Sequence, residues 1–217
     1  MVMTEIPGLL SLTVRPGRKA TMIEPEIFIL ADRTLNTVIA QILDDQWDII
    51  LPPNFATRQA DHQPTLREIV NYHAYDDAWV PDMLTGRTME QAGKEKFDGD
   101  LLGDDPKASF ATIVDTACEA ARRVVDLETI VHCSFGDFTV REYFWQINSF
   151  RGLRAHDIAN VIGADSRLPD DLVQGIWDEI SPRAEEWRSI GVFPAAVAVS
   201  EDAPLHDRLL GLTGRMP

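Results

Sequence analysis

A histidine and an aspartate, residue types that bind metals, transfer protons and pair with cations, lie on the apolar side of one predicted helix. Over residues 65–84 the apolar residues recur at helical spacing. Because a helix turns by about 100° per residue, His73 and Asp77 each lie within about 20° of Leu66, in the middle of the apolar arc. They are four residues apart and therefore stack on one face. The pattern predicts an imidazole and a carboxylate that both face inward.

Two arginines have the same placement on a second predicted helix, over residues 139–162. Relative to Val140, Arg151 lies about 20° and Arg154 about 40° from the centre of the apolar arc. We therefore expect both guanidinium groups to face inward. His156 lies about 160° away, so we expect it to face solvent and not to bind a metal.

Polar side chains directed into a core need partners, because burying an unpaired charge costs several kcal/mol. One interpretation is a structural network in which Asp77 pairs with an arginine and His73 with a carbonyl. The other is a polar pocket between the two helices, where His73 and Asp77 face Arg151 and Arg154 and a ligand binds. The remaining alternative is that these side chains do not face inward, since helix boundaries are the least certain part of a sequence-based assignment. One aspartate cannot neutralise two arginines, so we expect one arginine to bind solvent, another acidic side chain or an anionic ligand.

The other chemistry-bearing residues favour simpler interpretations. We expect His62 on the surface and Cys118 in the core. His132 and Cys133 are adjacent on an extended segment and point to opposite faces, so they do not make a nucleophile–base pair. The acidic segment 98–105 lacks the spacing of a calcium-binding loop and is read as a solvated loop. The sequence has no dinucleotide-binding glycine motif, phosphate-binding loop or G-x-S-x-G motif.

Long helical patterns separated by loops predict an all-α fold. We expect an irregular segment over 1–24, a four-helix bundle over 25–163 and a small C-terminal helical appendage over 164–217, packed on the bundle. The four long helices are predicted near 25–44, 65–84, 106–126 and 139–162. In the appendage, we expect a helix over 169–190 that breaks at 181–182, a small strand over 192–199 and a last helix over 205–212.

The charge of the chain excludes some partners. Among its 217 residues, 35 acidic side chains outnumber 20 basic ones, which gives a net charge of −15. Such a chain is repelled by nucleic acid and by anionic membrane surfaces. Two cysteines do not make a disulfide framework, and neither a signal peptide nor a membrane-spanning run is evident. We therefore expect a cytoplasmic protein.

Several short motifs resemble those of the DinB-like, mycothiol-dependent maleylpyruvate isomerase family, helical-bundle proteins of actinobacteria. The resemblance covers most of the chain from about residue 28, and it is the combination that is specific. The motifs are 65–70 (TLREIV), 84–88 (LTGRT), 97–106 (FDGDLLGDDP), 134–138 (SFGDF), 141–143 (REY), 157–159 (DIA), 162–163 (IG), 208–210 (RLL) and 214–215 (GR).

The resemblance implies a DinB-type four-helix bundle with a divalent metal, held by a histidine on the second helix and an acidic residue plus a histidine on the fourth. It also implies mycothiol as a possible thiol cofactor. This sequence departs from the pattern, because the metal-ligand positions fall on Tyr72, Phe150 and Arg154, with His73 one residue after the first. Phenylalanine has no donor atom and arginine is a permanent cation.

Three hypotheses follow. The first is a thiol-dependent isomerase or transferase that uses a metal bound by His73 and Asp77. The second is a metal-free protein that binds an anionic small molecule through Arg151 and Arg154, with Asp77 and Tyr72 also at the site. The third is a non-catalytic paralogue that forms a homodimer.

Overall fold

The computed structural model describes residues 23–52, 55, 62–134 and 136–217. Most of the expected irregular segment 1–24 lies outside them. The elements, in chain order, are α1 (Glu24–Ile39), the 3-10 turn η1 (Asp44–Gln46), α2 (Leu66–Met83), α3 (Met89–Ala92), α4 (Pro106–Arg122), β1 (Ile130–Cys133), β2 (Gly136–Thr139), α5 (Val140–Ile162), α6 (Asp170–Ile180), α7 (Ala184–Ser189) and α8 (Leu205–Leu212).

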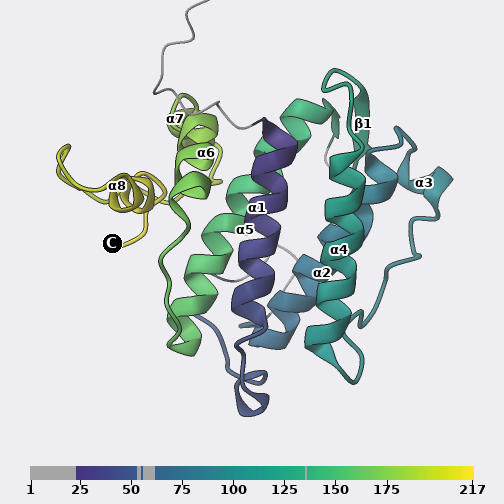
Figure 1. The fold of residues 1–217 in the computed structure, drawn as a ribbon, viewed down its shortest axis with the longest axis horizontal. Helices are drawn as coiled ribbons and strands as arrows, with labels where there is room; N and C mark the ends of the chain where they lie inside the picture. Colours follow the sequence, from purple (N-terminus) through teal and green to yellow (C-terminus); the bar gives the residue numbers. More distant parts are fainter. Residues whose placement is uncertain (1–22, 53–54, 56–61, 135) are drawn as a thin grey trace, which may run out of the picture.

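Four long helices form the main body of the protein (Figure 1). Helix α1 packs against both α4 and α5, and α2 packs against α4. The backbones of α2 and α5 approach less closely than these pairs. The all-α prediction is confirmed for the described residues, in which β1 and β2 pair only with each other, as an antiparallel hairpin.

Local signals in the sequence place the ends of these helices. Thr65 and Thr139 each begin a helix through a reciprocal capping box with a glutamate three residues later. Asp105 caps α4, and Pro106 is its first residue. Gly163 ends α5 in the left-handed conformation that glycine adopts without strain. Two helices are shorter than predicted. Helix α1 ends at Ile39 and not at residue 44, and α4 ends at Arg122 and not at residue 126.

The C-terminal elements lie beside α1 and α5, on the opposite side of the molecule from α3 (Figure 1). The expected break at 181–182 is present between α6 and α7, and α8 spans the predicted 205–212. The prediction of a strand over 192–199 is wrong, because this described segment pairs with no strand. It contains Pro194, which has no backbone N–H to donate to a sheet.

The expectation that His156 faces solvent is also wrong. Its side chain is 6% exposed, its Nδ1 donates to the carbonyl of Ser166 at 2.9 Å, and its Nε2 accepts from Asn160 at 3.0 Å. Its ring lies edge-on to His206 of α8, with 5.7 Å between ring centroids. The helix phase was correct, but the C-terminal segment covers the outer face of α5 near His156.

Among the described helices we find none that combines the length and the apolar character needed to span a bilayer.

A buried carboxyl group joins α6 to α5. Glu179 is 5% exposed and accepts a 2.8 Å hydrogen bond from the side-chain amide of Asn148. The same amide donates to the main-chain carbonyl of Glu24 at 3.0 Å. Burial raises the pKa of Glu179 from 4.5 to about 8. The folded protein therefore keeps a proton on Glu179 at pH values where the unfolded chain has lost it.

We expect Glu179→Gln to remove part of the pH dependence of stability. Since the folded pKa is raised, the contribution of Glu179 to stability falls as pH rises from about 4.5 to about 8. The measurement is urea unfolding of parent and variant at pH 5, 7 and 8.5. The variant should gain stability over the parent as pH rises, whereas the exposed control Glu185→Gln should follow the parent. Equal pH slopes for Glu179→Gln and the parent would contradict this account.

Candidate functional site

An ion pair buried completely from solvent connects α2 to α5. Arg151 is 0% exposed, and its Nε donates to Oδ1 of Asp77 at 2.6 Å. Its Nη2 also contacts that oxygen, and its Nη1 donates to the carbonyl of Ile147 at 3.3 Å. The guanidinium carbon lies 5.1 Å from the centre of the Phe28 ring. Asp77 and Arg151 thus face inward and contact each other.

A second carboxylate, from α1, completes this cluster. Oδ1 of Asp32 lies 3.5 Å from Nε of Arg151, and Oδ2 accepts from the Cys118 thiol at 3.8 Å. Burial, together with the neighbouring carboxylate of Asp77, raises the pKa of Asp32 well above its usual value. Burial raises the pKa of Asp77 as well, against the opposing effect of Arg151. One guanidinium cannot offset two buried carboxylates, so the Asp32–Asp77 pair holds a proton. Arg151 is therefore neutralised by the protein itself.

Sequence reasoning missed Asp32, although the signal was present. Asp32 lies four residues after Phe28 and three before Leu35, both 0% exposed. The facing arithmetic that identified Asp77 would have placed Asp32 on the inner face of α1 as well.

His73 lies beside this cluster in an aromatic environment. Its ring is 0% exposed and stacks on Phe150 at 4.8 Å between centroids, with 28° between the planes. Neither ring nitrogen has a hydrogen-bond partner among the described residues, so the structure does not show the carbonyl partner of the network interpretation. Burial, and then the charges of Arg154 and Arg151, lower the pKa of His73 well below its usual value. The imidazole is neutral and offers one donor and one acceptor.

Arg154 is buried with little charge compensation. It is 8% exposed, and its Nη1 lies 3.9 Å from Oδ2 of Asp157. Both oxygens of Asp157 already accept 2.8 Å hydrogen bonds from Arg215. Nε of Arg154 has no partner in the described part of the chain. Burial lowers the pKa of Arg154 to about 10, against the opposing effect of Asp157.

Aromatic rings surround the Arg154 guanidinium. Its central carbon lies 4.6 Å from the Phe55 ring centre and 5.4 Å from that of Phe150. Phe150 therefore contacts both His73 and Arg154. The ring of Phe150 is only partly buried and is the side chain that joins the two groups.

Two further side chains of α2 lie at the edge of this cluster, both partly exposed. Tyr72 is edge-on to Phe150 at 6.2 Å, and burial raises its pKa to about 12. Asp76, one helical turn later, has its pKa raised by burial to about 7. Asp76 was not predicted, because it lies about 80° from Leu66, at the limit of the apolar arc.

The residues at the metal positions that the resemblance implies do not fit a divalent metal. Phe150 supplies no donor atom and Arg154 repels a cation, so of these positions only Tyr72 and the neighbouring His73 offer a donor atom. Among the residues that the structure describes, no group of three or more histidine, cysteine, aspartate or glutamate side chains is arranged to hold a metal ion.

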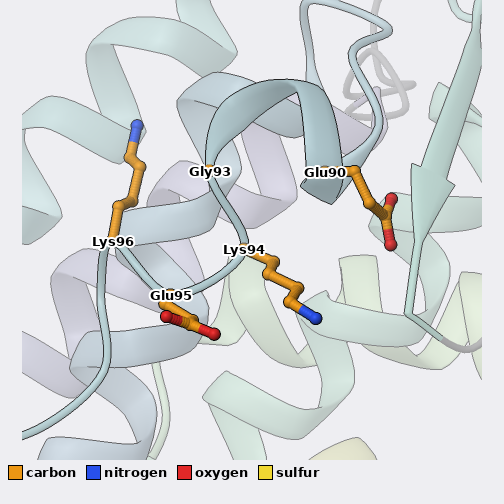
Figure 2. A pocket seen from close by; sticks show the side chains of 5 residues that line it. All are labelled: Glu90, Gly93, Lys94, Glu95 and Lys96. Carbon is orange, nitrogen blue, oxygen red and sulfur yellow. The ribbon is translucent and has the colours of Figure 1, made fainter.

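A surface hollow lies elsewhere, beside α3 (Figure 2). Its charges balance and do not converge, since the side chains of Lys94 and Lys96 point in opposite directions. A second hollow lies over the outer surfaces of α2 and α4. The residues that line these hollows are Glu90, Gly93, Lys94, Glu95 and Lys96 for the first, and Pro81, Asp115, Thr116, Glu119, Ala120 and Arg123 for the second. Neither includes a residue of the buried cluster.

Comparisons with known family models, curated proteins and solved structures find no match to this chain.

We expect Asp77→Ala to destabilise the fold by about 3–5 kcal/mol, because it removes the carboxylate that accepts the 2.6 Å hydrogen bond from the buried Arg151 and leaves only the more distant Asp32. The control is Asp115→Ala, which removes an exposed partner of Arg33 and should cost about 1 kcal/mol or less. Urea unfolding monitored by circular dichroism at pH 7 measures both free energies. A similar small loss for both variants would show that the Asp77–Arg151 pair does not stabilise the fold.

Proposed function

We propose that this protein binds a small anionic molecule between α2 and α5 without a metal ion, and that Arg154 pairs with that anion. The observation that carries the proposal is the incomplete neutralisation of Arg154. It is buried, its Nε has no partner among the described residues, and the nearest carboxylate, Asp157, is held on both oxygens by Arg215. A buried cation in this state is costly, and an anionic ligand would offset that cost.

His73 supports the same proposal. The His73 ring and the Arg154 guanidinium both contact Phe150. Burial, and then the charge of Arg154, lower the pKa of His73. A neutral imidazole can donate one hydrogen bond to an oxygen of an anion held by Arg154. The incompletely neutralised charge of Arg154 near the imidazole favours an anion over a metal ion at this position. Arg151, proposed from the sequence as a second ligand-binding residue, is occupied by Asp77 and Asp32.

A second candidate is a thiol-dependent isomerase or transferase on a DinB-like four-helix bundle, the activity that the sequence motifs resemble. The packing of α1, α2, α4 and α5 is compatible with such a bundle. Asp76 favours a catalytic role, because a carboxyl group with a pKa of about 7 can accept and return a proton near neutral pH. Under this candidate, the anion bound by Arg154 would be the substrate, and Asp76→Asn would abolish turnover without abolishing binding.

We expect Arg154→Ala to weaken binding of the anion by at least about 30-fold, since losing one partner of a buried, hydrogen-bonded charge pair costs about 2 kcal/mol or more. The measurement is the ligand-induced rise in melting temperature, followed by calorimetry, with acetate, benzoate, phthalate and inorganic phosphate as probes. Arg154→Lys should recover only part of the affinity, because an ammonium group lacks the planar fork of donors.

The control is Arg123→Ala, which removes the same charge from an exposed position at the end of α4. It should bind as the parent does. The fold of Arg154→Ala should persist, because Asp157 keeps Arg215 as a partner. If no probe binds the parent, or if Arg154→Ala binds as tightly as the parent, the proposal is wrong.

A further inference from the structure

We infer that the ligand at Arg154 is a compact monoanion with a flat conjugated body, an aromatic monocarboxylate, rather than a phosphate or a dicarboxylate. This inference rests on the proposed function and specifies the chemical class of its ligand. Two independent features support this ligand class: the sum of the charges around Arg154 and the aromatic rings that contact its guanidinium group.

One negative charge would neutralise the side chains around Arg154. Asp157 lies between Arg154 and Arg215, so these three side chains sum to a single positive charge. Arg151 is already offset by Asp77, and His73 is neutral. A monocarboxylate would complete the balance. A phosphate dianion or a dicarboxylate would bring a second charge into a largely buried site without a partner, which is unfavourable.

The donors at the site also match a carboxylate. Nε of Arg154 is unpartnered within the described chain, and the neutral His73 ring carries one N–H without an acceptor there. Two N–H donors suit the two oxygens of one carboxylate. A phosphate monoester presents three terminal oxygens and would leave some of them without a donor in this apolar environment.

The enclosing side chains favour a flat body over a bulky one. Phe55 and Phe150 lie over the Arg154 guanidinium, and His73 stacks on Phe150. Tyr72 lies perpendicular to Phe150, and both rings are partly exposed. A conjugated ring can stack on Phe150 or meet the edge of Tyr72 in the geometries that aromatic pairs prefer. A saturated ring of similar size lacks those interactions.

The first experiment compares five probes on the intact protein by calorimetry at pH 7, namely benzoate, cyclohexanecarboxylate, acetate, phthalate and inorganic phosphate. We expect benzoate to bind more tightly than cyclohexanecarboxylate by about 3- to 10-fold, the contribution of an aromatic pair beyond its buried area. Acetate, phthalate and phosphate should bind more weakly than benzoate. Arg154→Ala should abolish binding of every probe that the parent binds.

The second experiment replaces the ring that contacts both polar groups. Phe150→Leu keeps an apolar side chain but removes the stacking surface, so benzoate affinity should fall about 3- to 10-fold while acetate affinity stays unchanged. The matched control is Phe97→Leu, which removes a partly buried ring that packs edge-on against Trp79 at 5.0 Å. The control should bind benzoate as the parent does.

The outcomes separate this inference from the proposed function. If phosphate, phthalate or acetate binds as tightly as benzoate and still requires Arg154, the ligand class is wrong and the anion site stands. If benzoate and cyclohexanecarboxylate bind equally, or Phe150→Leu weakens acetate as much as benzoate, the aromatic preference is wrong. If no probe requires Arg154, the proposed function fails and this inference fails with it.

Discussion

The buried contact between Asp77 and Arg151 is the interaction on which the interior of this protein depends. Asp77 comes from α2 and Arg151 from α5, while Asp32 of α1 joins the same guanidinium. Three of the four long helices therefore meet at one charged group that is fully removed from water. Separating the partners of a buried ion pair is costly, since removing one partner costs about 3–5 kcal/mol. The cluster thus fixes the relative position of helices whose other contacts are mainly apolar.

Arg151 and Arg154 differ in how completely buried carboxyl groups neutralise their charge, because the nearest such groups pair with Arg151. Both arginines lie on the inner face of α5, but Asp32 of α1 and Asp77 of α2 contact Arg151 and not Arg154. Asp157 is the remaining carboxylate near Arg154, and Arg215 of the C-terminal segment donates hydrogen bonds to both of its oxygens. Arg154 is left among aromatic rings beside a neutral imidazole. The anion-binding proposal is therefore a consequence of how carboxylates are distributed over the whole fold, including the end of the chain.

Periodicity and capping residues in the sequence determined which segments are helical and which side chains face inward. The burial of His73, Asp77, Arg151 and Arg154 follows from helix geometry, because a rotation of about 100° per residue is set within each helix. The ends of α2, α4 and α5 follow from side chains that cap their own backbone. These features are local, so a sequence contains the information for them.

The tertiary structure alone decided which of these groups are partners. Asp77 and Arg151 are 74 residues apart in the chain, and no local pattern distinguishes Arg151 from Arg154 as the arginine that Asp77 neutralises. The burial of His156, on a face of α5 that its own helix would expose, depends on where the C-terminal segment packs. The position of Phe150 between His73 and Arg154 likewise depends on the separation of α2 and α5. Helix phase fixes a direction for each side chain, but contact requires a distance, and distances between helices are set by the packing of the whole core.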